Sequence, residues 1–314
     1  MSLATVERVS ELCLDSLDHS HPTWRNTDVS AGPTEQVQPT PGGGSVGQLG
    51  VLFLGRRHIQ REFVLGDTGL GFQPTRAVEL REVETTADHR ADPTAMAAAA
   101  DADTVLVFCV AGSTEYGRVD PVPELAEVAA DVNARCHVDA AFGGFFLPFT
   151  DRHWSFADAP IDTMTIDPHK AGRAAIPAGS LLARERKTLD ALAVETPYLA
   201  SDSQASLGGT RSGAGVASAN AAIDALWPAG YRAAADRTTA LAEWFAEGLA
   251  DRGYEMVDPV LPVVSWRPET GEFEQLRDAG WKIARTGNGE IRVVVMPHVT
   301  RAMLDAFLVD LDAL

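Results

Sequence analysis

The chain has 314 residues, of which 45% are hydrophobic and 7% aromatic, a composition that allows one large folded domain and a smaller one. Its 44 acidic and 26 basic residues give a formal net charge of -18, which argues against nucleic acid or an anionic membrane surface as a partner. No segment approaches the run of about 18 apolar residues that a membrane-spanning helix needs. The 3 cysteines form no CxxC pair and no secretory start precedes them, which favours a reducing cytoplasm over a disulfide framework.

The acidic balance comes mainly from a shortage of lysine. Lys170, Lys187 and Lys282 are the only lysines, while carboxylates are spread along the whole chain. A salt-loving source is a hypothesis that fits this composition.

The first 77 residues differ from the rest of the chain. They begin with a helical pattern, VERVSELCLDSL, and continue with a stretch rich in Pro, Gly, Thr and Gln at 26–50. Their hydrophobic periodicity is poor. We therefore expect an atypical, partly irregular amino-terminal segment over residues 1–77.

Helix and strand patterns alternate from about Pro93 onward. The predicted elements are an alanine-rich helix through Ala102, a strand at 104–110, a helix from about Pro123 to Asn133, and short strands at 136–138, 163–166 and 179–183. This alternation predicts an α/β fold with a mainly parallel sheet between helices, in a large domain over residues 78–230.

A second, smaller domain is predicted after Pro228. The pattern there gives a long helix to about Arg252, strands at 263–266 and 291–295, and a last helix from Thr300. We expect a small C-terminal α/β domain over residues 231–314.

Residues with ionisable side chains lie at the ends of two predicted strands, which is where the ligand crevice of an open α/β sheet is found. Asp167-Pro168-His169-Lys170 follows the strand at 163–166. A lysine nucleophile must lose its proton, which burial and nearby cations favour, and His169 is placed to help organise such a site. Taken alone, Lys170 could equally be a surface residue.

Asp139 ends another apolar strand, in the segment HVDAAFGG, and small residues after it leave room for a flat ring. Taken alone it could cap a turn or a helix. A third segment, LGGTRSG at 207–213, opens a predicted helix, and its backbone amides could bind phosphate. Glycine-rich turns of this kind also occur simply as tight turns.

Four segments together resemble the group II pyridoxal-phosphate-dependent decarboxylases, and within them the archaeal L-tyrosine/L-aspartate decarboxylases. These segments are HVDAAFGGF, TIDPHKAG, AVETPYLASDSQASLGGTRSGAG and IRVVVMPHVTRAML, and the resemblance runs from about Val78 to Leu314. It implies the fold type I architecture of pyridoxal-phosphate-dependent transferases, pyridoxal 5'-phosphate as the cofactor and no metal. It also implies a cytoplasmic homodimer with its sites at the subunit interface.

The resemblance implies a role for each matched residue. Lys170 would hold the cofactor as a Schiff base, Asp139 would keep the pyridinium nitrogen protonated, and His169 would adjoin cofactor and substrate, so these three form the expected catalytic set. Ala141 would pack on the ring, and Asp167 would lie on the phosphate side of the cofactor.

Four further residues take expected binding roles from the same resemblance. Ser113 and Thr114, in AGSTEYGRVDP, would approach the ring, and Thr210 would contact the phosphate from the second subunit. Arg292 would hold a substrate carboxylate with its two-pronged donor group, although a surface charge at a strand edge is the alternative. The expected reaction is loss of carbon dioxide from an L-amino acid, with L-aspartate (giving β-alanine for coenzyme A) preferred over L-tyrosine (giving tyramine).

The amino-terminal part departs from the family pattern, and the chain looks short there. A phosphate-binding motif of the SGGTEAN kind and a ring-stacking histidine have no counterpart: Pro41–Val46 lacks the TEAN continuation and fits a linker better, and His58 is out of place. A catalytically impaired homologue therefore stays open as an alternative. A second alternative is a fold type I carbon–carbon lyase similar to sphingosine-phosphate lyase. The segment ETPYLASDSQASL resembles the decarboxylases more than these lyases.

Overall fold

The computed structural model describes residues 50–54, 79–191, 193–195, 203–204 and 212–314. The chain divides into two compact units, Met1–Val46 and Gly47–Leu314, and every described element belongs to the second. The predicted first helix, the Pro41–Val46 segment, His58 and Thr210 lie outside the described residues.

The elements predicted from Pro93 onward occur in the predicted order, and the structure adds others that the sequence patterns did not predict. The elements up to the long helix α6 are β1 (Gly50–Leu54), β2 (Glu79–Val83), α2 (Pro93–Ala99), β3 (Thr104–Val110), α3 (Val122–Asp131), β4 (Arg135–Asp139), the 3-10 turns η1 (Gly143–Phe145) and η2 (Leu147–Phe149), β5 (Thr163–Ile166), β6 (Ser180–Ala183), α4 (Arg186–Asp190), β7 (Val194–Glu195), β8 (Ser203–Gln204), α5 (Gly213–Leu226) and α6 (Ala229–Ala250). The remainder are β9 (Met256–Val257), β10 (Val263–Trp266), α7 (Glu272–Asp278), β11 (Ala284–Arg285), β12 (Ile291–Val294) and α8 (Arg301–Asp312).

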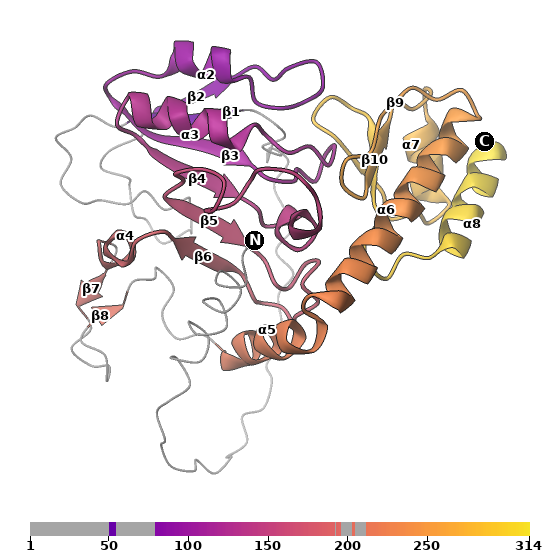
Figure 1. Cartoon of the computed structure of the whole chain (residues 1–314). Coiled ribbons are helices and arrows are strands. Elements are labelled where there is room, and N and C mark those ends of the chain that lie inside the picture. Colours follow the sequence, from indigo (N-terminus) through magenta and orange to yellow (C-terminus); the bar gives the residue numbers. More distant parts are fainter. Residues whose placement is uncertain (1–49, 55–78, 192, 196–202, 205–211) are drawn as a thin grey trace, which may run out of the picture. The chain divides into compact units, whose positions relative to one another are not determined.

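The larger sheet has six strands in the order β2-β1-β3-β4-β5-β6. Its centre is parallel, β3 with β4 and β4 with β5, as the alternating pattern predicts. The flanking pairs β1 with β2, β1 with β3, and β5 with β6 are antiparallel. Because β3, β4 and β5 run in the same direction, their carboxyl ends meet at one edge of the sheet (Figure 1).

One face of this sheet is buried beneath α3, which contacts β3 and β4. Strand side chains alternate between the two faces, and the residues that point toward this helix are fully buried. They are Val107, Cys109, Cys136, Val138 and Met164 on the strands, with Leu125, Ala126 and Ala129 on α3.

Helix α2 begins and ends at local signals. The Asp92 carboxylate accepts hydrogen bonds from the backbone of Thr94 and Ala95, and a proline occupies the first turn. The helix ends at Ala99, earlier than the predicted Ala102, because Asp101 donates its N–H to the Thr104 hydroxyl in a turn that leads into β3.

The smaller sheet is antiparallel, in the order β11-β12-β10-β9. Its core includes Phe245 of α6, Trp266 of β10 and Phe307 of α8, whose rings meet edge to face. Helix α6 also reaches the larger part, since the Tyr231 hydroxyl near its first turn donates to the Gly172 carbonyl at 2.8 Å. The domain boundary near residue 230 stays a prediction.

Candidate active site

Three loops that carry predicted site residues leave the same edge of the larger sheet. The Ala111 N–H after β3 donates to the Asp139 carbonyl at 2.8 Å, and the Ala140 N–H after β4 donates to the Thr165 carbonyl of β5 at 2.9 Å. Asp139 itself pairs in register with Thr165. The structure therefore brings together the ends of β3, β4 and β5, from which Ser113, Asp139 and Lys170 follow.

Lys170 lies in the turn that follows β5. Its Nζ is 2.9 Å from Asp167 Oδ2, and its side chain is 38% exposed against 15% for Asp167, so the amine stays accessible beside a shielded carboxylate. The ion-pair partner of Lys170 is therefore the Asp167 carboxylate, not a cation. His169 is held by the segment just before β6, because its N–H donates to the Ala178 carbonyl and its Nδ1 accepts the Ala178 N–H at 3.1 Å.

The bond to Ala178 fixes the tautomer of His169. Since Nδ1 accepts a hydrogen bond, the neutral ring carries its proton on Nε2, which lies 3.8 Å from Asp167 Oδ2. Asp167 therefore stands between the imidazole and the Lys170 amine.

Two glycines allow the DPHKAG and HVDAAFGGF segments to pack tightly. A Cβ on Gly172 would lie 2.6 Å from both the Pro168 carbonyl oxygen and the Phe145 ring. A Cβ on Gly143 would lie 2.0 Å from the Ala111 carbonyl oxygen. The backbone of each segment thus approaches its neighbour more closely than any side chain permits.

Asp139 presents a partly free carboxylate at the end of β4. Its Oδ1 accepts the Ala141 N–H at 2.9 Å, and within the described residues its Oδ2 accepts no hydrogen bond. Ala141 is 8% exposed and lies beside it. A carboxylate with one open oxygen can accept a ring N–H.

His137 lies on the same sheet face as Asp139, two positions earlier on β4. Its Nδ1 is 2.7 Å from the Thr163 hydroxyl and its Nε2 is 3.2 Å from the Thr165 hydroxyl, both on β5. Burial lowers the pKa of His137, and this effect outweighs the negative charge of Asp139, which acts to raise the pKa. Sequence reasoning did not single out this residue, although its period-2 spacing from Asp139 was a usable signal.

Thr114 and Arg292 meet across the two sheets. The Arg292 Nη1 donates to the Thr114 carbonyl and, at 3.0 Å, to the Thr114 hydroxyl. The Ser113 hydroxyl is buried and accepts the Tyr116 N–H at 3.3 Å. Arg292 therefore contacts a predicted site residue rather than standing alone at a strand edge.

These residues fit pyridoxal phosphate in the chemistry of their donors and acceptors. An accessible amine on Lys170 suits the cofactor aldehyde, and the open oxygen of Asp139 suits the ring nitrogen. Ala141 offers a small apolar surface beside that carboxylate. Thr210 lies outside the described residues, and the individual site roles stay predictions.

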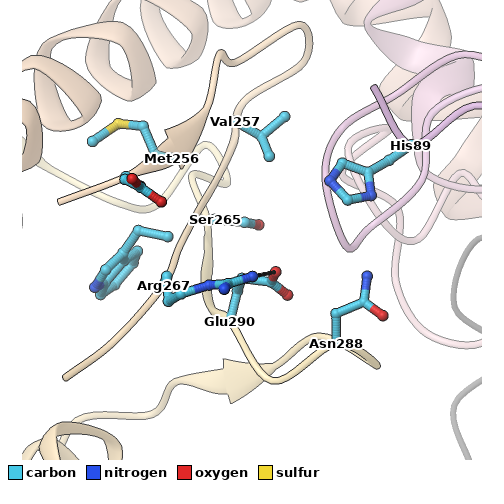
Figure 2. Close-up of a pocket in the computed structure, with 9 residues that line it drawn as sticks. His89, Met256, Val257, Ser265, Arg267, Asn288 and Glu290 are labelled. Atoms are coloured by element: carbon cyan, nitrogen blue, oxygen red, sulfur yellow. Dashed lines mark ion pairs between the residues drawn. The ribbon is translucent and has the colours of Figure 1, made fainter. Parts of the chain in front are cut away.

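A separate pocket of about 470 Å³ lies beside the smaller sheet (Figure 2). It is lined by His89, Glu255, Met256, Val257, Ser265, Trp266, Arg267, Asn288 and Glu290. None of the residues predicted as a site from the sequence belongs to this lining. Among the described residues there is also no group of three or more side chains suited to a metal ion, and no helix long and apolar enough to cross a membrane.

Comparison with known proteins gives consistent relatives. Residues 72–267 match the family model described as the pyridoxal-dependent decarboxylase conserved domain. A probable L-aspartate decarboxylase of Halobacterium salinarum is 62% identical over 237 residues, which cover 76% of this chain and 67% of that protein. A probable L-tyrosine/L-aspartate decarboxylase of Methanocella arvoryzae is 41% identical over 228 residues, covering 71% of this chain and 61% of that protein.

Solved structures share the fold. Glutamate decarboxylase of Lactobacillus brevis aligns with a TM-score of 0.66 at 21% identity, covering 74% of this chain and 59% of that chain. Sphingosine-1-phosphate lyase of Burkholderia pseudomallei aligns with a TM-score of 0.63 at 21% identity, covering 72% and 55%. The chain thus spans little more than half of the solved structures it matches, and the predicted fold type I class is confirmed. On the family match and the identity to its curated relatives, the chain belongs to the pyridoxal-dependent decarboxylase family.

Proposed function

We propose that this protein uses pyridoxal 5'-phosphate to remove the α-carboxylate of an L-amino acid as carbon dioxide, with L-aspartate as the first candidate and L-tyrosine as the second. The observation that carries the proposal is the placement of the Lys170 amine and the open Asp139 oxygen after adjacent parallel strands. The printed names of the relatives from Halobacterium salinarum and Haloarcula marismortui, 62% and 59% identical, support L-aspartate.

Three residues of the chain, Lys170, Asp139 and Arg292, have separate roles in this proposal. Lys170 would hold the cofactor through its amine, and Asp139 would keep a proton on the ring nitrogen. The bound cofactor supplies a ring that accepts the electron pair left when carbon dioxide departs. Arg292 would bind a substrate carboxylate with its two-pronged donor group and so orient the bond that must break.

The setting of this activity is part of the same proposal. A cytoplasmic homodimer that makes β-alanine for coenzyme A is supported by the family motifs. A salt-rich interior is supported by the net charge of -18. Light scattering of the purified chain measures the oligomeric state directly.

The scarcity of lysine makes the test of the cofactor site clean. The purified chain is incubated with pyridoxal phosphate, reduced with borohydride and digested, and the modified peptides are identified by mass spectrometry. We expect the label on Lys170 and its loss in Lys170→Ala. Lys187→Ala is the matched control, because Lys187 is 73% exposed and pairs with Glu185. It follows β6, whose last residue Ala183 pairs with Thr163 at the start of β5, at the edge of the sheet opposite Lys170.

Turnover is measured on the same preparations, as carbon dioxide and amine released from L-aspartate and from L-tyrosine. Release by the wild type and by Lys187→Ala, with none by Lys170→Ala, is the expected result. Label on Lys170 without release from any amino acid would favour the catalytically impaired homologue instead. Equal label on all three lysines would refute the site.

A further inference from the structure

Several residues of the turn over 112–118, which leaves β3, contact the smaller sheet or the loops beside it. The Ser265 hydroxyl of β10 donates to the Glu115 carbonyl, and the Gly287 N–H lies 3.3 Å from a Glu115 carboxylate oxygen. Gly117 has a φ of 67°, and a Cβ there would lie 3.1 Å from the Leu261 carbonyl oxygen. A glycine at this position lets the turn adopt a left-handed conformation against the small-domain backbone.

Arg292 is held at one end of this contact. The Arg292 Nη1 donates to both the carbonyl and the hydroxyl of Thr114. The Arg292 Nε, in contrast, is buried and has no hydrogen-bond partner among the described residues. A buried N–H without an acceptor is costly, so the position of this guanidinium depends on the contacts that its other nitrogens make. The guanidinium is therefore fixed on one side and unsatisfied on the other.

Tyr116 makes the central bond of the contact. It is 2% exposed, and its hydroxyl donates to Glu290 Oε2 at 2.8 Å, accepts from Asn288 Nδ2 at 2.9 Å and lies 3.2 Å from the Thr286 hydroxyl. Burial raises the pKa of Tyr116 to about 12, so the phenol keeps its proton and stays a donor. Glu290 immediately precedes the strand that carries Arg292.

The carboxylate of Glu290 is suited to accept this bond. Burial acts to raise its pKa, but hydrogen bonds from Thr286 and Tyr116 outweigh burial and lower the pKa. Arg267 Nη2 lies 3.7 Å from its other oxygen. On the large-domain side, the His89 ring stacks on Tyr116 at 3.8 Å, and Figure 2 shows His89 facing Asn288 and Glu290 across the pocket.

We propose that Tyr116 is a positioning residue for substrate binding. Its hydroxyl ties the hairpin between β11 and β12 to the 112–118 turn through Glu290, and this places Arg292 so that Thr114 can hold Nη1. The remaining edge of the guanidinium is then aimed at the substrate carboxylate. This inference rests on the proposed function, because it assigns the carboxylate to an amino-acid substrate.

Tyr116→Phe in the full chain tests the inference, since it removes one oxygen and keeps the ring stacked on His89. We expect KM for the amino acid that the wild type decarboxylates to rise about tenfold, with kcat changed less than about twofold. Pyridoxal phosphate labelling of Lys170 stays at the wild-type level. Tyr254→Phe is the matched control, because the Tyr254 hydroxyl lies beside a different carboxylate, Glu272 of the small-domain part, and the KM of this variant stays that of the wild type.

A binding measurement separates this inference from the proposed function. Succinate, a dicarboxylate with no amino group to react, is titrated calorimetrically into the wild type, Tyr116→Phe and Tyr254→Phe. About tenfold weaker binding by Tyr116→Phe alone supports the inference even if no amino acid is turned over. Equal KM values or equal succinate affinities in Tyr116→Phe and wild type would overturn it, as would a wild type that neither turns over an amino acid nor binds succinate.

Discussion

Replacing Gly143 by alanine should destabilise the protein strongly, for a reason visible only in the packed structure. The added Cβ would lie 2.0 Å from the Ala111 carbonyl oxygen and 2.9 Å from a Leu147 methyl group. The first of these atoms belongs to the backbone just after β3. The Gly112 N–H, on the same peptide group, donates to the Arg118 carbonyl at 3.1 Å, so this carbonyl cannot rotate away freely. Overpacking of a core costs about 1–3 kcal/mol, and a rigid partner favours the upper end, about 3 kcal/mol.

Gly144→Ala is the matched control in the same motif. The three atoms nearest to its Cβ would all belong to the Ile166 side chain, at 3.1 to 3.4 Å, and this side chain can shift by a few tenths of an ångström. Unfolding is measured in urea by far-ultraviolet circular dichroism. With an m value of about 3 kcal/mol/M, a loss of about 3 kcal/mol in the free energy of unfolding lowers the urea midpoint of Gly143→Ala by about 1 M. A midpoint for Gly143→Ala within about 0.2 M of the wild type, or below it by no more than Gly144→Ala, would refute the reasoning.

Two further predictions concern buried polar groups. Tyr231→Phe leaves the Gly172 carbonyl without its donor, and we expect a loss of about 1 kcal/mol in the free energy of unfolding, measured by urea denaturation; an unchanged midpoint would count against this bond. Burial holds the pKa of His137 below its ordinary value of 6.5, so the unfolded chain takes up a proton before the folded one as the pH falls below about 6.5. The wild type should therefore lose stability between about pH 7 and 5 more steeply than His137→Gln, and parallel profiles in urea would contradict the assignment.

Several parts of the fold could be predicted because their signals are local. The strand at 163–166 was predicted at its observed bounds, and the last helix follows Thr300, whose hydroxyl accepts the Met303 N–H as its cap. The motifs around Asp139 and Lys170 were also legible, because each directly follows a short apolar strand. The short strands β9 and β11 have 2 residues each and carry no such pattern.

Periodicity, caps and motifs depend on residues close together in the chain, and they were enough to predict the family and most elements from Pro93 onward. The bond between Tyr116 and Glu290, 174 positions away, and the contact of Thr114 with Arg292 are visible only in the folded protein. The same is true of the ion pair between Lys170 and the Asp167 carboxylate. Such pairs leave no periodic trace, because each forms only after the strand ends and the smaller sheet have packed together.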